Sequence, residues 1–247
     1  GAPDMGLAVA SLVAFNPQFI YISAAINNDV LAALMGTAVL VLCTQLVRGG
    51  VTWRRAILLG VIYGLAILTK LHLAALGLVI VVARLLAVRT EGRDGKVCAG
   101  GPVLPPLIGD LALIFGVASA LAGWWFVRNW RLYGDPLGFS AFLAIVGRRH
   151  PVPTLWQLLA EWKGFVKSYW GLFGALNVPS PAWVYWTLSL FTGIGLLAAP
   201  FALWCRWIKG DTKRVRLLQI GLIALWPVIL LISLVRWTLL TPASQGR

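Results

Sequence analysis

The sequence predicts an all-α protein, a polytopic transmembrane helical bundle, and three observations lead to that prediction. Of the 247 residues, 60% are hydrophobic, and the mean hydropathy is +0.84. Only 12% of the residues are charged, whereas soluble domains carry about 25%. Several apolar windows reach the roughly 20 residues that cross a bilayer, and they do not alternate as barrel strands do.

We expect about seven membrane segments, separated by breaker and charged residues. Pro17 lies inside the first segment and predicts a kink, because proline removes a backbone donor and clashes with the preceding turn. The third segment is short for a full crossing, and Lys70 and His72 separate it from the fourth. The fifth begins after the pair Pro105-Pro106. The expected segments are residues 6–26, 30–47, 56–69, 73–88, 107–127, 183–207 and 217–235.

A long outer loop, residues 128–182, joins the fifth and sixth segments and contains an amphipathic stretch. Thr154 is a candidate N-cap for a helix there, because it follows Pro153 and has a side-chain oxygen. Glu161, Lys163 and Lys167 interrupt apolar residues spaced three and four apart, a pattern typical of a helix lying in the membrane interface. Those apolar residues are Leu155, Leu158, Leu159, Trp162, Phe165, Val166, Tyr169 and Trp170.

The basic residues predict the orientation. Loops 48–55, 84–104 and 206–216 fall on the same side of the membrane in the expected topology. Together they hold 12 of the 21 lysines and arginines, so that side is expected to be cytoplasmic. The net charge of +13 is explained in the same way, and no nucleic-acid partner is expected. The three cysteines form no CxxC pair, so they predict neither a zinc site nor a disulfide framework.

The opposite, non-cytoplasmic face collects the unusual polar residues. Asp29 lies in "AINNDV", between two apolar segments. It could simply cap the second helix, where the helix dipole favours an anion. It could also act as a general base or metal ligand, made more basic by partial desolvation. The two roles are compatible, and the neighbouring Asn28 is expected to contact substrate.

Each cation on this face also has two readings. Lys70 and His72 form either a turn with a snorkelling lysine or an anion-binding pair. Arg128 and Arg131, in "WWFVRNWRLYGDPLG", either anchor a helix end or bind a lipid-linked phosphate through paired guanidinium donors. A last set near the C-terminus either frays or binds anions, and it consists of Arg236 and Arg247.

The order of several stretches resembles the GT-C superfamily of polytopic membrane glycosyltransferases, and more narrowly the bacterial proteins of glycosyltransferase family 39 related to protein mannosyltransferases. These stretches are "NPQFIYISAAINND", "YGLAILTK", "WWFVRNWRLYGDPLG", "GLFGALNVPSPAWVY" and "QGR". The resemblance implies a multi-pass protein of the bacterial plasma membrane. It also implies a polyprenyl-phosphate-linked sugar donor and membrane lipids as partners, with an acceptor reached from the non-cytoplasmic side.

The resemblance also implies roles for individual residues. Such enzymes place an acidic base in the first outer loop and a second acidic residue at the start of a later helix, and Asp29 matches the second. The first has no counterpart here, so residues 1–247 are expected to be a fragment of a larger single transmembrane domain, and the fragment by itself is not expected to be active. Cations near the lipid phosphate are matched by Lys70, Arg128, Arg236 and Arg247.

The reaction that the resemblance implies is direct displacement at the anomeric carbon, with a carboxylate as base. No cofactor is required with certainty; a divalent metal stays open, although one carboxylate is not a metal site. A transporter or flippase of a lipid-linked intermediate is the main alternative, and it predicts polar residues deep in the segments. Few are present: Asp110, Thr37, Thr44 and Gln45. The third alternative is a non-catalytic membrane assembly subunit.

Overall fold

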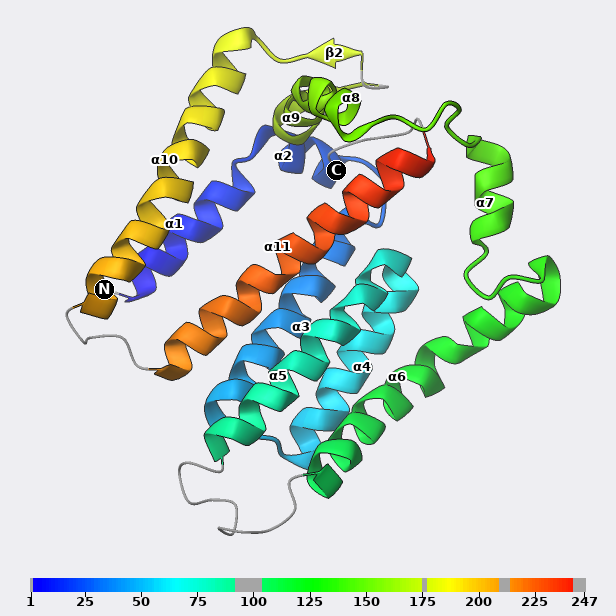
Figure 1. Ribbon diagram of the computed structural model, residues 1–247, viewed down its shortest axis with the longest axis vertical. Helices are drawn as coiled ribbons and strands as arrows, with labels where there is room; N and C mark the ends of the chain where they lie inside the picture. Colours follow the sequence, from blue (N-terminus) through cyan, green and yellow to red (C-terminus); the bar gives the residue numbers. More distant parts are fainter. Residues whose placement is uncertain (1, 92–103, 175–176, 209–213, 242–247) are drawn as a thin grey trace. The chain divides into compact units, whose positions relative to one another are not determined.

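The computed structural model describes residues 2–91, 104–174, 177–208 and 214–241, and these residues are almost entirely helical (Figure 1). They form two compact units. The first contains the described residues of Gly1–Val30, Val146–Asp211 and Leu234–Arg247, and the second those of Leu31–Ile145 and Thr212–Ser233. The all-α prediction is confirmed; the prediction of one transmembrane domain stays a prediction.

Among the described residues, five helical segments are long and apolar enough to cross a membrane. A sixth span results if α1 (Ala2–Ala14) and α2 (Pro17–Ala24) are counted together; they are bent by 65° at the break before Pro17. The predicted kink is therefore confirmed. The third predicted segment, residues 56–69, lies in α4 (Trp53–Thr69), whose 17 residues are fewer than the roughly 20 that cross a bilayer, so it is not among the candidate spans.

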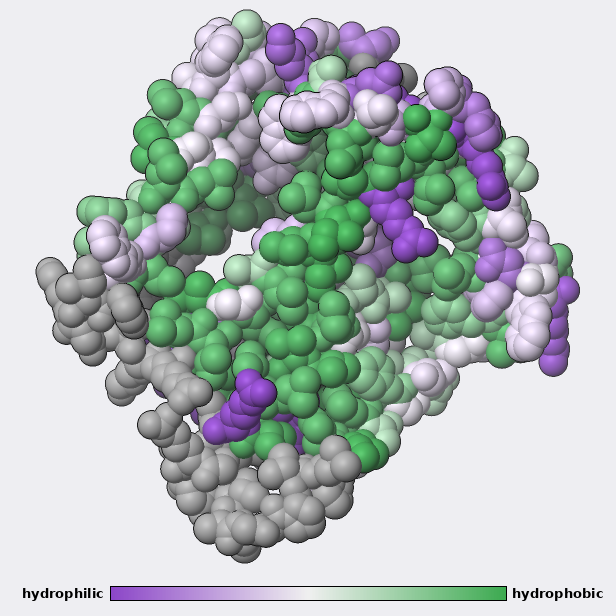
Figure 2. Space-filling view, in the orientation of Figure 1, coloured by the Kyte–Doolittle hydropathy of each residue, from purple (hydrophilic) through white to green (hydrophobic). Residues whose placement is uncertain are grey.

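The five segments lie in helices whose exposed faces are apolar. Figure 2 shows hydrophobic side chains over much of the visible surface, and in α10 Leu197 is 77% exposed. Apolar exposure of this extent is unusual in water but normal beside lipid. The helices that contain the spans are α3 (Asp29–Gly49), η1 with α5 (Leu71–Ala75 and Leu76–Glu91), α6 (Leu104–Tyr133), α10 (Ala182–Ile208) and α11 (Arg214–Leu240).

The second unit is an up-and-down arrangement of α3, α4, α5 and α6 (Figure 1). Its core is small and apolar, and includes the fully buried Val39, Leu59, Ile80 and Ile114. Because successive helices alternate in direction, their connections alternate between two ends of this unit. One end carries Arg48, Arg54, Arg55 and Arg89, and the other carries Lys70, His72, Arg128 and Arg131. Within this unit, the segregation of cations therefore agrees with the topology predicted from the sequence.

The turn between α3 and α4 shows how local sequence sets one of these ends. Gly50 follows α3 with a φ of 72°, a conformation that favours glycine. The side chain of Thr52 accepts a hydrogen bond from the Arg55 amide at 3.4 Å and begins α4. Arg55 Nη1 donates to the carbonyls of Gly49 and Gly50, at 3.3 and 3.2 Å, so the arginine also caps the preceding helix.

Close approach of α4 to α6 depends on Gly60. A Cβ added at Gly60 would lie 2.7 Å from the Ile114 carbonyl oxygen and 2.9 Å from Val117 Cβ. We expect Gly60→Ala to destabilise the protein by roughly 1–3 kcal/mol, because backbone must move to admit the methyl group. Gly116→Ala is the control, since no atom lies within 4 Å of its added Cβ. Thermal unfolding in detergent measures both; equal midpoints would contradict the close packing.

The first unit contains α1, α2, α8 (Leu155–Ala160), α9 (Trp162–Gly171), α10 and the last turns of α11. A short antiparallel pair, β1 (Leu172–Phe173) and β2 (Val178–Pro179), follows α9, with Leu172 opposite Pro179. The predicted interfacial helix is thus two helices, because the chain turns at Glu161. Thr154 caps α8 as predicted, in a reciprocal capping box with Gln157.

Several predicted boundaries were wrong. Helix α6 begins at Leu104, before the pair Pro105-Pro106, and α11 continues past residue 235 to Leu240. The fifth segment does not end at Val127, because α6 continues to Tyr133 before Gly134 ends it with a φ of 67°. The fourth extends from Leu71 rather than 73, because a turn of 3-10 helix precedes α5. Arg84 is not in a loop: it lies within α5 and is 3% exposed. Asp135 lies in a turn that leads into α7 (Phe139–Val146).

Candidate functional site at the start of helix α3

The segment before Asp29 is held by asparagine side chains. Asn16 caps α2, its Oδ1 accepting from the amides of Gln18 and Phe19 at 2.9 and 3.2 Å. After α2, Asn27 Nδ2 donates to the Ile22 carbonyl at 2.9 Å. Asn27 Oδ1 accepts from the Asp29 amide at 2.8 Å. The backbone at Asp29 is therefore fixed against α2, and Asp29 is a half-buried residue at the first position of α3.

Helix α2 is attached in turn to the strand pair. Gln18 is 4% exposed, and its Oε1 accepts from the Leu172 amide at 3.0 Å. Tyr21 donates its hydroxyl to the Gly174 carbonyl at 3.1 Å, and its ring meets Phe173 edge-on at 5.2 Å. Gly174 has a φ of 63° and turns the chain out of β1. The polar segment that carries Asp29 therefore follows a helix, α2, that is hydrogen-bonded to β1 and to Gly174 within the first unit.

The hydrogen-bonded network continues to the first turn of α10. Tyr185 donates its hydroxyl to the Gly171 carbonyl at 2.6 Å and accepts from the Ser180 amide at 2.8 Å. Ser180 Oγ also donates to the Gly171 carbonyl, at 3.2 Å. Three segments, the end of α9, the residues after β2 and the start of α10, are thus joined at one carbonyl.

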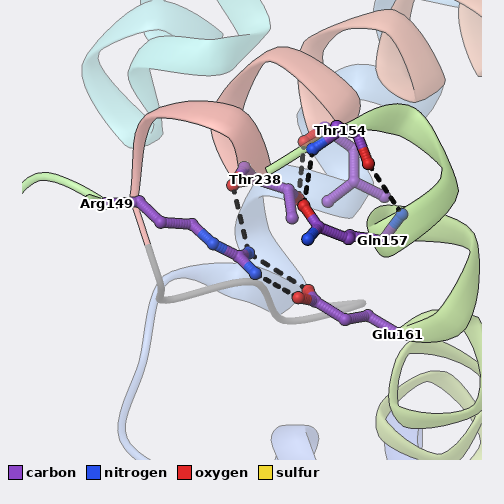
Figure 3. Close-up of polar contacts among 6 residues, drawn as sticks. Arg149, Thr154, Gln157, Glu161 and Thr238 are labelled. Atoms are coloured by element: carbon purple, nitrogen blue, oxygen red, sulfur yellow. Dashed lines mark hydrogen bonds and ion pairs between the residues drawn. The ribbon is translucent and has the colours of Figure 1, made fainter. Parts of the chain in front are cut away.

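Arg149, in the stretch that precedes α8, is hydrogen-bonded to the last turn of α11 (Figure 3). Its amide donates to the Leu240 carbonyl at 3.0 Å, and its Nη1 donates to the Thr238 carbonyl at 3.4 Å. The guanidinium also pairs with both carboxylate oxygens of Glu161, from Nη2 and, at 3.1 Å, from Nη1. Paired donors of this kind are strong and directional. We call Arg149 and Glu161 the clasp.

The clasp is predicted to be sensitive to acid. The hydrogen bond from Arg149 and its charge lower the pKa of Glu161, and the pKa of Arg149 is raised by the same hydrogen bond. A lowered carboxyl pKa contributes stability that is complete above the unfolded value of about 4.3 and is lost as pH falls through the folded value. Hydrogen exchange of residues 155–171, corrected for intrinsic rates, is expected to rise below about pH 4. In Arg149→Gln that additional rise should be absent; its persistence would contradict the role of the clasp.

The structure distributes the predicted site residues between the two units. Asn28, Asp29 and Arg236 belong to the first unit, and Arg236 is exposed two residues before Thr238. The second unit holds four others, and Arg247 lies outside the described residues. Those four are Lys70, half-buried at the end of α4, and the exposed His72, Arg128 and Arg131.

Two acids of the predicted outer loop, Asp135 and Glu161, bind structural partners. The Asp135 carboxylate accepts from the amides of Ser140 and Leu137, at 2.9 and 3.0 Å, and these bonds lower its pKa. Glu161 is in the clasp. The role of Asp29 as a catalytic base stays a proposal. Among the described residues, no group of three or more His, Cys, Asp and Glu side chains could hold a metal ion.

Sequence reasoning missed several residues that organise this region. Gln18 and Leu172 are 154 positions apart, and Arg149 and Thr238 are 89 apart, so no local pattern links them. Asn27 was the exception that could have been found, because an Asx residue two positions before a helix start commonly binds a backbone amide. No protein-family model, curated protein or solved structure matches this chain.

Proposed function

We propose that the chain belongs to a membrane glycosyltransferase that moves a sugar from a polyprenyl-phosphate donor to an acceptor on the non-cytoplasmic face. The observation that supports this best is the anchored position of Asp29. Asn27 fixes its backbone, and this half-buried residue begins a candidate span, at the boundary between apolar helix and polar segment. A base for lipid-linked chemistry needs such a boundary, because the donor's phosphate stays at headgroup depth.

The proposed step is a single displacement. The Asp29 carboxylate, or an acidic residue outside this chain working with it, takes the proton from an acceptor hydroxyl. The acceptor oxygen forms a bond to the anomeric carbon, and the bond from that carbon to the phosphate oxygen breaks. Polyprenyl phosphate leaves with the electron pair and gains negative charge on its terminal oxygen. Arg236, in the same unit as Asp29, is a cation that could stabilise this charge.

The charged pair within the candidate spans, Arg84 and Asp110, does not support the transporter alternative. Arg84 Nε donates to Asp110 Oδ2 at 2.7 Å, so the buried arginine is neutralised by a neighbouring helix. A permeation path would instead present polar groups to the transported headgroup. This pair is better explained as a contact that joins α5 to α6.

The test is a donor-cleavage assay on the complete protein in phospholipid vesicles. Candidate polyprenyl-phosphate sugars are supplied, and free polyprenyl phosphate and glycosylated acceptor are quantified by mass spectrometry. A transferase releases both in equal amounts. Movement of intact donor between leaflets, with no bond cleavage, would contradict the proposal and support a flippase.

A further inference from the structure

One end of α9 lies at the depth of a membrane boundary, because it is bonded to the beginning of a candidate span. The span in α10 runs from Ala182 to Cys205. Tyr185, in its first turn, donates to the carbonyl of Gly171, the last residue of α9, at 2.6 Å. The C-terminal end of α9 therefore cannot lie far from where α10 enters the apolar layer.

The other end of α9 is held at a second boundary of the same face. Glu161 immediately precedes α9, and its clasp partner Arg149 is bonded to the carbonyls of Thr238 and Leu240. The span in α11 ends at Leu240. Consecutive spans cross in opposite directions, so the start of α10 and the end of α11 reach the same membrane face. With both ends held there, α9 runs along the boundary rather than across the membrane.

The outer side of α8 and α9 is apolar and uncovered in the described residues. The exposed fractions are 80% for Trp156, 61% for Leu159, 52% for Trp162 and 48% for Tyr169. The packed side of α9 is different: Ser168 and Gly171 are buried there. Tryptophan and tyrosine at headgroup depth are typical of interfacial helices, since one part of each ring is apolar and the other can bind water.

Cations stand beside this apolar surface. Lys163 and Lys167 are both exposed and one turn apart, so they share one side of α9. The only acid between residues 148 and 171, Glu161, is paired with Arg149. The surface therefore has uncompensated positive charge on the face where the positive-inside rule does not call for it. Charge of this sign beside an apolar stripe is complementary to anionic phospholipid.

We propose that this surface, which we call the α8–α9 lipid face, binds anionic phospholipid of the non-cytoplasmic leaflet. Trp156, Leu159 and Trp162 would enter the boundary between headgroups and acyl chains, and Lys163 and Lys167 would contact lipid phosphates. The inference needs no transfer reaction, so it stands or fails separately from the proposed function. It goes beyond an interfacial position, because it requires a preference for headgroup charge.

The first test measures depth in the complete protein. Spin labels are placed at Trp162→Cys and Gly164→Cys, two exposed positions about 200° apart on the helix, with the native cysteines replaced by alanine. In phosphatidylglycerol nanodiscs, the label at 162 is expected to collide with oxygen and be protected from a water-soluble nickel chelate. The label at 164 is expected to behave in the opposite way. Equal access of the chelate to both, or dipolar broadening between copies at 162, would overturn the proposal.

The second test measures headgroup preference. A fluorophore at Gly164→Cys is quenched by nitroxide-labelled phosphatidylglycerol or phosphatidylcholine, titrated into zwitterionic nanodiscs. Removing each lysine is expected to lower the preference for phosphatidylglycerol about fivefold, so that Lys163→Gln/Lys167→Gln loses up to about 25-fold. The matched control, Lys163→Arg/Lys167→Arg, should retain the preference. Absence of a preference in the unaltered protein, or its persistence in the glutamine variant, would show that the surface does not select anionic lipid.

Discussion

Replacing Asp29 by asparagine in the complete protein is expected to lower sugar transfer by about 10²–10⁴-fold, the contribution typical of a general base. Asparagine has the same shape and retains a side-chain oxygen, so it can still serve at the start of α3. The bond from the Asp29 amide to Asn27 is made by the backbone and should survive. What the variant loses is the ability to accept a proton. Initial rates of polyprenyl phosphate release measure the effect.

Asp135→Asn is the matched control for this variant. Asp135 is also predicted to lie on the outer face, but its carboxylate binds backbone amides at the start of α7. Its replacement should leave transfer within a few-fold of the unaltered rate. If Asp29→Asn turns over as fast as the unaltered protein, Asp29 has only a capping role and the proposed mechanism fails. If the two variants lose the same activity, the effect is structural.

The second large effect is expected at the buried charged pair of the second unit. Arg84 is 3% exposed and donates to Asp110 at 2.7 Å, between α5 and α6. We expect Asp110→Leu to destabilise the protein by about 3–5 kcal/mol, because it leaves an uncompensated arginine among apolar helices. The measurement is the midpoint of thermal or denaturant unfolding in detergent.

A double variant distinguishes the cost of the unpaired charge from the cost of altered packing. Arg84→Met/Asp110→Leu removes both charges and should recover most of the lost stability, since apolar replacements of a buried pair are often neutral. Arg89→Met, an exposed arginine in the same helix, should change stability by less than about 0.5 kcal/mol. If Asp110→Leu and the double variant are equally unstable, the loss comes from packing rather than from the stranded charge.

Much of the fold follows from local sequence, because the information that sets each helix is close in the chain. Pro17 explains the break between α1 and α2, and Thr154 with Gln157 explains the start of α8. The cation pattern of the second unit follows from the direction of its helices. The predicted count of seven spans exceeds the five or six of the described residues, because α4 has 17 residues, fewer than the roughly 20 that cross a bilayer.

The errors have a common physical origin in long-range contacts. Arg84 looked like a loop residue because it is charged, but Asp110, 26 positions away, allows it to be buried. Arg128 and Arg131 looked like the start of a loop for the same reason. They lie in the last turns of α6, where the helix dipole favours cations and only Gly134 ends the helix.

The key residue of the candidate site could be predicted from the sequence, but the hydrogen bonds that hold it could not. Asp29 could be singled out because a carboxylate between two apolar segments is rare. The bonds that support it could not, because Gln18, Leu172, Gly171 and Tyr185 come together only through the folded first unit. Whether each predicted cation reaches the same membrane face as Asp29 depends on the topology, which rests on loop charge.

The measurement that tests this account most directly is therefore the sidedness of single cysteines, read with a membrane-impermeant thiol reagent on intact cells and after permeabilisation. The account predicts labelling from outside at positions 28, 72, 131 and 236. It predicts labelling at positions 48, 54 and 89 only after permeabilisation. If position 28 is labelled from outside but 72, 131 or 236 is not, the polar residues do not share one face, and the proposed lipid-phosphate site is contradicted.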